Sequence, residues 1–179
     1  VDVSTFGQTR VSMGIHPDRF TWLLEKGESF QTPEVVLVYS DQGLNGMSQA
    51  FHDVFREHLM RGFWVQRERP VLLNNWEAKS FDFDEERILT LARKAASVGV
   101  ELFVMDDGWF GDRNHERAGL EDWSVNLGKL PSGLTGIIDQ VHGLGMKFGL
   151  WIEPEMVNKD SQLYRAHPDW ILHHPKHSQ

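Results

Sequence analysis

Short apolar runs alternate with amphipathic stretches along the second half of the chain. Three runs are almost wholly apolar, as in strands buried on both faces, and they span residues 71–73, 100–105 and 146–151. Between the runs, apolar positions recur at the three- and four-residue spacing of a helix with one buried face. These positions are Ile88, Leu91, Ala92 and Ala95 in the first helix and Leu134, Ile137, Ile138 and Val141 in the second.

The ends of both helices carry recognisable signals. Asp82 is the predicted N-cap of the first helix, and Gly99 is the residue that ends it. Ser132 is the predicted cap of the second helix, which ends at Gly143 and Gly145. The order after Pro70 is therefore strand, helix, strand, helix, strand.

The first part of the chain has a different pattern. Residues 1–42 contain β-type runs, clearest at 20–24 and 35–39, and turn signals separate them. We interpret residues 1–42 as the C-terminal end of an N-terminal β-sandwich domain. Residues 43–69 form a predicted helical linker, whose apolar face carries Phe51, Val54, Phe55 and Leu59.

Strands alternating with amphipathic helices predict an α/β fold with a parallel sheet, either a barrel or an open doubly wound sheet. Aromatic or acidic residues follow all three strands: Trp76, Asp106 with Asp107, and Trp151 with Glu153. In (β/α)8 TIM barrels this end of the strands is the active face. We therefore predict that residues 70–179 are the first part of a catalytic (β/α)8 barrel, about three βα units long.

Composition and charge narrow the class of partner. A formal net charge of -8 disfavours nucleic acid and anionic membrane surfaces, so a neutral partner is expected. The chain has no cysteine, which excludes disulfides and thiolate chemistry. It lacks an apolar run of membrane length, a signal peptide and an initiator Met, so we expect a cytoplasmic piece of a longer protein. His173, His174 and His177 fit a solvated tail better than a metal site.

The sequence Asp106-Asp107-Gly108-Trp109 is the sharpest chemical feature. Two carboxylates at a strand end beside an aromatic face suit a polyol ring, whose hydroxyls would be held while its C–H face packs on the ring. The alternative is a strand end with a capped turn and a core tryptophan. Adjacent residues diverge, so we interpret Asp106 and Asp107 as binding residues and not as a catalytic pair, and expect the fold to survive substitution of either.

Tryptophans and glutamates near the other strand ends are further candidates. Trp76 and Trp151 could wall a sugar site, and a core role is the alternative for Trp76. Glu153 and Glu155 would share a side of an extended chain, which makes them a rival catalytic pair. The alternative is that Pro154 rigidifies the strand exit and that the glutamates bind backbone or arginine partners.

At these residues the chain resembles the bacterial α-galactosidases of glycoside hydrolase family thirty-six, also called melibiases. The motifs occur in family order along nearly the whole chain: TPE at 32–34, YS at 39–40, GMS at 46–48, NNWEA at 74–78, DDGWFG at 106–111, GMKFGLW at 145–151, EPEMV at 153–157 and HPDW at 167–170.

The resemblance implies a β-sandwich, a linker helix and a catalytic barrel. It implies that Asp106 and Asp107 hold galactose hydroxyls between walls formed by Trp76 and Trp151, with Trp109, Glu153 and Glu155 as further candidates. The family hydrolyses terminal α-linked galactose with retention, without a cofactor or metal. Its nucleophile and acid/base are aspartates on the fourth and sixth barrel strands, which the resemblance places beyond Gln179.

The expected partner is a galactoside of the melibiose or raffinose type, and the expected assembly is a homo-oligomer. The isolated chain is expected to be inactive. A self-sufficient carbohydrate-binding module, an α-N-acetylgalactosaminidase and a galactosyl transferase remain as alternatives.

Overall fold

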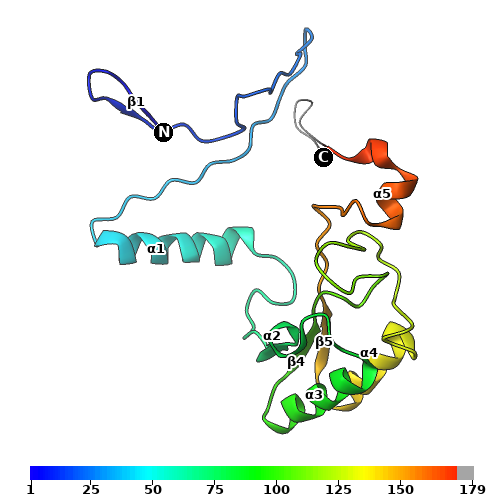
Figure 1. Ribbon diagram of the computed structural model, residues 1–179. Helices are drawn as coiled ribbons and strands as arrows, with labels where there is room; N and C mark the ends of the chain where they lie inside the picture. The colour runs from blue at the N-terminus through cyan, green and yellow to red at the C-terminus, as the bar shows by residue number, and fades with distance from the viewer. Residues whose placement is uncertain (173–179) are drawn as a thin grey trace. The chain divides into compact units, whose positions relative to one another are not determined.

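The computed structural model describes residues 1–172 of the chain (Figure 1). The chain divides into two units, Val1–Arg67 and Glu68–Gln179, and each is described by itself. No helix within residues 1–172 is both long enough and apolar enough to cross a membrane.

The first unit begins with a small antiparallel hairpin. Strands β1 (Asp2–Val3) and β2 (Thr9–Arg10) pair, and the hydroxyl of Ser4 accepts hydrogen bonds from the backbone N–H groups of Phe6 and Gln8 in the turn. No regular element follows before residue 43.

The prediction of strands at residues 20–24 and 35–39 is therefore wrong for the described chain. A β-run becomes a strand when a neighbour satisfies its N–H and C=O groups, and neither run has such a neighbour within residues 1–172. Leu37 and Tyr39 in the second run are strongly exposed. The assignment of residues 1–42 to a sandwich domain stays a prediction.

The predicted linker helix is present but begins earlier than its apolar pattern. Helix α1 (Gly43–Val54) continues into the π-helical turn η1 (Phe55–Leu59). Phe51 and Phe55 stack one turn apart, with ring centroids 5.8 Å apart. Neither α1 nor η1 has a fully buried residue: on the apolar face Phe51 and Val54 are half-buried, and Phe55 and Leu59 are exposed.

The second unit contains a parallel sheet, as the sequence predicts, and its strands lie in the order β3-β4-β5. Figure 1 labels β4 and β5 in this unit. The strands are β3 (Leu72–Asn74), β4 (Leu102–Met105) and β5 (Lys147–Leu150). Asn74 pairs with Val104, and Val104 with Gly149, so the C-terminal ends of the three strands lie at one edge of the sheet. This register places the residues after each strand close together.

Helices follow the first two strands and cover the sheet. After the short α2 (Trp76–Lys79) come α3 (Glu85–Ser97) and, after β4, α4 (Gly133–Gly143), which packs on α3 and β5. The core between helices and sheet consists mainly of Phe83, Ile88, Ala92, Ala95, Phe103, Met105, Trp109, Phe110, Leu120, Leu130, Ile137, Val141 and Met146. The chain continues from β5 to α5 (Gln162–Ala166) and the 3-10 turn η2 (Pro168–Trp170).

One predicted helix cap is wrong and a second differs in detail. The N-cap of α3 is Asp84, whose Oδ1 accepts from the N–H of Arg87 at 2.9 Å, and Asp82 forms an exposed ion pair with Arg87 instead. Ser132 is the N-cap of α4 as predicted, but its side chain makes no capping hydrogen bond. Its N–H donates to Glu85 of α3 at 2.9 Å, which ties the two helix starts together.

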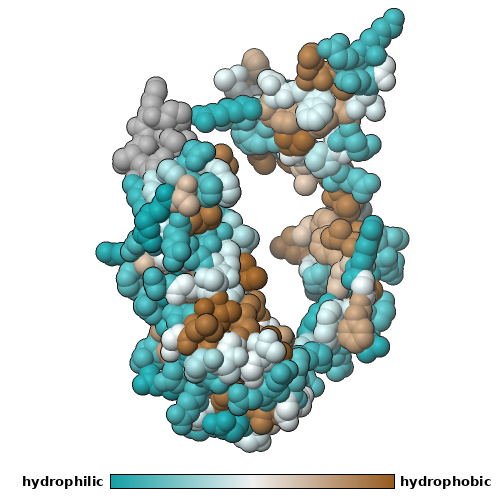
Figure 2. Space-filling view, turned by 90° about the vertical axis from the view of Figure 1, so that its right-hand side faces the viewer, coloured by the Kyte–Doolittle hydropathy of each residue, from teal (hydrophilic) through white to brown (hydrophobic). Residues whose placement is uncertain are grey.

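The α/β class is confirmed, and the described part of the sheet is open. β3 and β5 are edge strands among residues 1–172. Apolar side chains remain on the surface of both units, as the brown areas of Figure 2 show. The assignment of this sheet to the first part of a (β/α)8 barrel stays a prediction.

Candidate functional site

The residues that follow β3, β4 and β5 line a pocket of about 340 Å³. Its lining residues are Trp76, Phe81, Asp106, Asp107, Arg113, Glu116, Trp151 and Glu153. Four of the predicted binding residues, Trp76, Asp106, Asp107 and Trp151, are among them, as is Glu153. The register of the sheet explains why these side chains lie close together, because each residue lies one to three positions beyond the end of its strand.

Asp106 is half-buried and its carboxylate is fixed on both oxygens. The N–H of Asp107 donates to Oδ1 at 2.7 Å, and the side-chain amide of Asn74 donates to Oδ2. The backbone N–H of Asp106 donates to Oδ1 of Asn75 at 2.8 Å. Since a carboxylate oxygen has two lone-pair positions, both oxygens retain the capacity to accept from a ligand.

Asp107 is buried, only 5% exposed, and forms a bidentate ion pair with Arg113. Nε of Arg113 lies 3.0 Å from Oδ1 and Nη2 lies 2.8 Å from Oδ2. Arg113 is equally buried, so the two charges neutralise one another away from water. Arg113 lies in the loop after β4, and its side chain is turned inward and not toward solvent.

The same guanidinium holds the loop that follows β4. Its Nη1 donates to the backbone carbonyls of Glu116 at 2.8 Å and Ala118 at 3.0 Å, and to Oδ1 of Asn158 at 2.9 Å. Asn158 comes from the segment after β5, so Arg113 joins segments from two strand ends. Asp107 is thus tied to the position of the whole loop.

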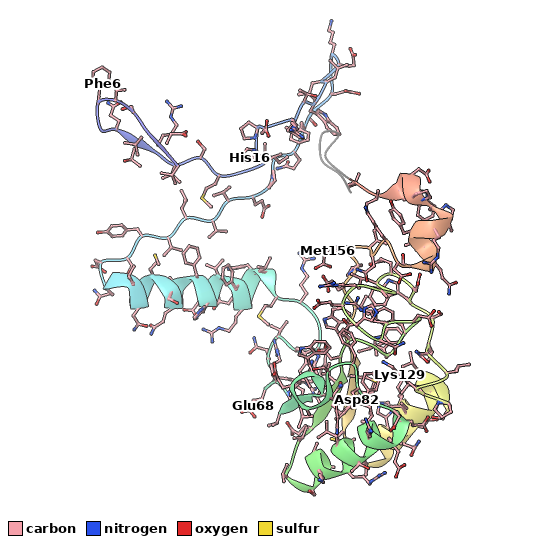
Figure 3. All side chains as sticks on the ribbon, in the orientation of Figure 1. Phe6, His16, Glu68, Asp82, Lys129 and Met156 are labelled. Carbon is pink, nitrogen blue, oxygen red and sulfur yellow. The ribbon has the colours of Figure 1, made fainter. Side chains whose placement is uncertain are left out.

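Lys129 ties together three other backbone segments beside the pocket. Its Nζ donates to the carbonyls of Phe81 and Gly108 at 3.0 Å and of Arg113 at 3.3 Å. Burial lowers the pKa of Lys129, and the carboxylates of Asp107 and Asp82 oppose this effect. Figure 3 labels Lys129 and Asp82, which lie on neighbouring segments of the second unit.

Gly108 is the position where the turn after the two aspartates needs a glycine. Its φ is +95°, in the region that L-residues avoid, and an added Cβ would meet the ring of Phe81 at 3.1 Å and the ring of Phe83 at 3.3 Å. The close approach of the backbone to these rings places the carbonyl of Gly108 against Lys129. The turn keeps this geometry because Gly108 has no side chain.

Aromatic side chains form one wall of the pocket and the core beneath it. Trp76 packs edge-on against Phe81 with ring centroids 5.0 Å apart. Trp151 stacks at 6.5 Å on Phe110, and its carbonyl accepts from Nε1 of Trp109 at 3.0 Å. Trp109 itself is 4% exposed and does not line the pocket. The structure thus places Trp109 in the core, as the alternative interpretation has it, where it supports Trp151.

The two glutamates after β5 do not form a pair. Glu153 lines the pocket, whereas Glu155 lines a separate groove with Pro154 and Met156. The expectation that they share a side assumes an extended chain, but the chain turns at residues 154–155. The turn at Pro154 and Glu155 therefore removes the extended geometry that the rival catalytic pair assumes.

Comparison with known proteins places the chain in a family. The family model for melibiases matches residues 29–179, which is most of the chain. The chain belongs to the melibiase family. It is 62% identical over 175 residues to alpha-galactosidase AgaA of Geobacillus stearothermophilus and 51% identical over 175 residues to alpha-galactosidase Mel36A of Lactobacillus acidophilus. These matches cover 98% of this chain and 24% of each relative, so the chain spans about a quarter of their length.

Solved structures of melibiase relatives have the same architecture. The crystal structure of AgaA from Geobacillus stearothermophilus, a member of glycoside hydrolase family 36, matches with a TM-score of 0.89 and 62% sequence identity. The match covers 99% of this chain and 25% of that chain. Variants of AgaA have been crystallised in complex with raffinose and with stachyose.

Sequence reasoning missed several residues that build the site of this melibiase chain. The residues that were not singled out are Asn74, Phe81, Arg113 and Lys129. Only Asn74 gives a local signal, because it ends a strand beside Trp76. The contacts of Arg113 and Lys129 span loops and become visible only once these have folded.

Metal binding finds no support in the described part of the melibiase chain. No group of three or more His, Asp or Glu side chains among residues 1–172 could hold a metal ion. His173, His174 and His177, the loosely spaced histidines near the end, lie outside the described residues.

Proposed function

We propose that this chain is the part of a retaining α-galactosidase that binds the terminal galactose of its substrate. The observation that carries the proposal is the meeting of Trp76, Asp106 and Trp151, from three strand ends, in one pocket. The α-galactosidase names of the relatives and the oligosaccharide complexes of AgaA variants support the same substrate class. Galactosides of the raffinose type are the proposed partners.

Asp106 is the proposed acceptor of galactose hydroxyls. Its carboxylate faces the pocket in a fixed orientation and keeps free lone pairs on both oxygens. Charge-assisted hydrogen bonds of this kind are about twice as strong as neutral ones. Trp76 and Trp151 are the proposed walls, against which the apolar C–H face of the sugar packs.

Asp107 has a double role in this proposal. Its contacts with Arg113 hold the loop after β4, and a lone pair on the pocket side remains for one sugar hydroxyl. Because its charge is neutralised by Arg113, Asp107 is a weak candidate for nucleophile or base. Binding and loop positioning are the functions that its surroundings favour.

The catalytic carboxylates of the proposed enzyme come from outside this chain. A retaining glycosidase needs two carboxyl groups about 5–5.5 Å apart on either side of the scissile bond. Glu155 lines a different groove and Asp107 is ion-paired with Arg113, so neither is a good member of such a pair. We assign nucleophile and acid/base to two aspartates on later barrel strands, which carry out double displacement without a cofactor.

The complete enzyme and the 179-residue chain test this proposal side by side. The complete enzyme should hydrolyse an aryl α-galactoside with retention, so that the α-anomer of galactose is the first product. Proton NMR of the anomeric signal during the reaction detects which anomer forms first. The isolated chain should show no turnover. Turnover by the chain alone that Glu153→Gln abolishes would overturn the assignment of the catalytic groups.

Parallel assays separate the neighbouring functions. Preference for an aryl α-N-acetylgalactosaminide would indicate the related hexosaminidase activity, and transfer of galactose to an added sugar in place of water would indicate a transferase. A carbohydrate-binding module is the second candidate, since the pocket already combines tryptophan rings with carboxylates from three strand ends. Galactose binding by a complete protein that hydrolyses no glycoside would favour the module.

A further inference from the structure

Asn74, the last residue of β3, contacts two of the proposed sugar-binding residues at once. Its Nδ2 donates to Oδ2 of Asp106, and its Oδ1 accepts from the backbone N–H of Trp76 at 2.7 Å. It does not line the pocket itself. We propose that Asn74 is a positioning residue that sets the carboxylate of Asp106 and the start of the Trp76 segment for galactose binding. This inference rests on the proposed function.

The hydrogen bonds of the Asn74 amide fix its orientation. With the amide reversed, its NH2 group would face the N–H of Trp76 and its oxygen would face the carboxylate of Asp106. Both contacts would be repulsive. One orientation therefore satisfies both partners, and a movement of either partner is felt by the other.

On the Asp106 side, the amide completes the restraint of the carboxylate. The N–H of Asp107 already holds Oδ1, and without Asn74 the group would be free to rotate about that single contact. Rotation would change the direction of the lone pairs that the sugar hydroxyls need. The contribution of Asn74 is therefore to orient Asp106, and it makes no contact with the sugar.

On the Trp76 side, the amide starts α2. Oδ1 of Asn74 accepts from the N–H two residues further on, that of Trp76, and this contact forms an Asx-turn. The turn sets the direction in which the four-residue helix α2 leaves the strand. The Trp76 ring then meets Phe81 edge-on. The Asn74 side chain therefore fixes the position of Trp76 relative to the carboxylate of Asp106.

The neighbour Asn75 shows what a structural asparagine looks like in the same place. Asn75 is fully buried, and its Oδ1 accepts from the N–H of Asp106, while its Nδ2 finds no partner in the described chain. Asn74 is exposed, so its hydrogen bonds contribute little to the core. A substitution of Asn74 should therefore affect binding more than folding.

The test uses Asn74→Asp and Asn74→Ala in the complete enzyme. Asn74→Asp keeps the oxygen that accepts from Trp76 but places a second carboxylate against Asp106. Two carboxylates at hydrogen-bond distance share a proton, and the pKa of the pair rises above the ordinary value of about 4. The shared proton replaces the lost N–H bond at low pH, and repulsion displaces Asp106 as pH rises through the raised pKa.

The readouts are the Kd of galactose, an uncharged ligand, and the melting temperature without ligand. Near about pH 5 the Asn74→Asp variant should bind within a few fold of wild type, and near about pH 8 its Kd should rise about tenfold or more. Its melting temperature should fall below wild type over the same range. Asn74→Ala should weaken binding about tenfold at both values. Asn114→Asp, the same substitution in an exposed loop, is the matched control and should change neither readout.

The outcomes separate the two proposals. Wild-type binding by both variants at both pH values, or a loss that is independent of pH in Asn74→Asp, would overturn the positioning role. A wild-type enzyme that neither binds galactose nor hydrolyses a galactoside would overturn the proposed function and this role with it. The ligand-free melting temperature still reports, in that case, whether Asn74 contacts Asp106.

Discussion

Two aspartates that are adjacent in the sequence have opposite surroundings in the structure. Asp106 is half-buried, faces the pocket and makes only neutral hydrogen bonds, whereas Asp107 is buried against the guanidinium of Arg113. Successive side chains at a strand end point to different sides, which explains why they separate. Their substitution should therefore have different effects, although the sequence treats them alike.

Replacement of Asp106 should weaken catalysis and leave the fold intact. Asp106→Asn keeps the shape of the side chain but replaces a charged acceptor by a neutral amide. The loss of one charge-assisted hydrogen bond, about 1.5–3 kcal/mol, should lower kcat/KM of the complete enzyme roughly ten- to a hundredfold. Steady-state kinetics with an aryl α-galactoside measure the effect, and an unchanged melting temperature is the control. Wild-type kinetics would reduce Asp106 to a turn residue.

Replacement of Asp107 should destabilise the protein. Asp107→Asn leaves the charge of Arg113 buried without a partner, which costs about 3–5 kcal/mol. The expectation that the fold survives either substitution stays a prediction, and the buried ion pair indicates that Asp107→Asn has the larger cost in stability. Chemical denaturation of the complete enzyme measures the change. The control is Asp112→Asn, the same substitution at an exposed position of the same loop, which should change the stability little.

At the scale of elements, the apolar pattern predicted the three strands and the two long helices, because burial on one or two faces dictates that pattern. The N-cap of α3 was harder to predict than the helix itself, since Asp82 and Asp84 lie two positions apart and aspartate is a good N-cap residue at either position. Asp84 takes the role because its backbone is extended, with φ -131° and ψ 176°, and its side chain reaches the N–H of Arg87. Local backbone geometry of this kind cannot be derived from residue type.

The alternative caps give a direct stability test. Asp84→Ala removes the hydrogen bond to the N–H of Arg87 and should lower the free energy of unfolding by about 1 kcal/mol. Asp82→Ala removes an exposed ion pair with Arg87 and a negative charge near Lys129, and it should cost less, about 0.5 kcal/mol. Denaturant unfolding of both variants in the complete enzyme compares them. Equal losses would contradict the assignment of Asp84 as the cap.

The site was predictable where it depends on strand ends and not where it depends on loops. Trp76, Asp106, Asp107 and Trp151 follow strands directly, so the parallel register alone brings them together. Glu155 was misplaced because a turn at Pro154 intervenes. The loop contacts of Arg113 and Lys129 depend on side chains that meet backbone carbonyls far along the chain, which no periodicity encodes.

At the scale of the whole molecule, the described sheet has two open edges and an incomplete cover. Val71 and Leu72 at the first edge are 59% and 52% exposed. In the first unit, Phe6, Leu37 and Tyr39 are exposed by more than four-fifths. Exposed strand edges and apolar surface of this kind favour pairing with additional strands and helices. The relatives are about four times longer, so their remaining residues could supply such elements.

The isolated chain should therefore associate with itself. β3 and β5 are edge strands among residues 1–172, and edge strands invite pairing with another chain. The exposed Phe55 and Leu59 add apolar surface in the first unit. The net charge of -8 opposes association by repulsion, so added salt should increase it. Size exclusion coupled to light scattering, at low and high salt, measures the mass. A monodisperse monomer with a cooperative thermal transition at both salt concentrations would mean that 179 residues already form a closed fold and would contradict this reasoning.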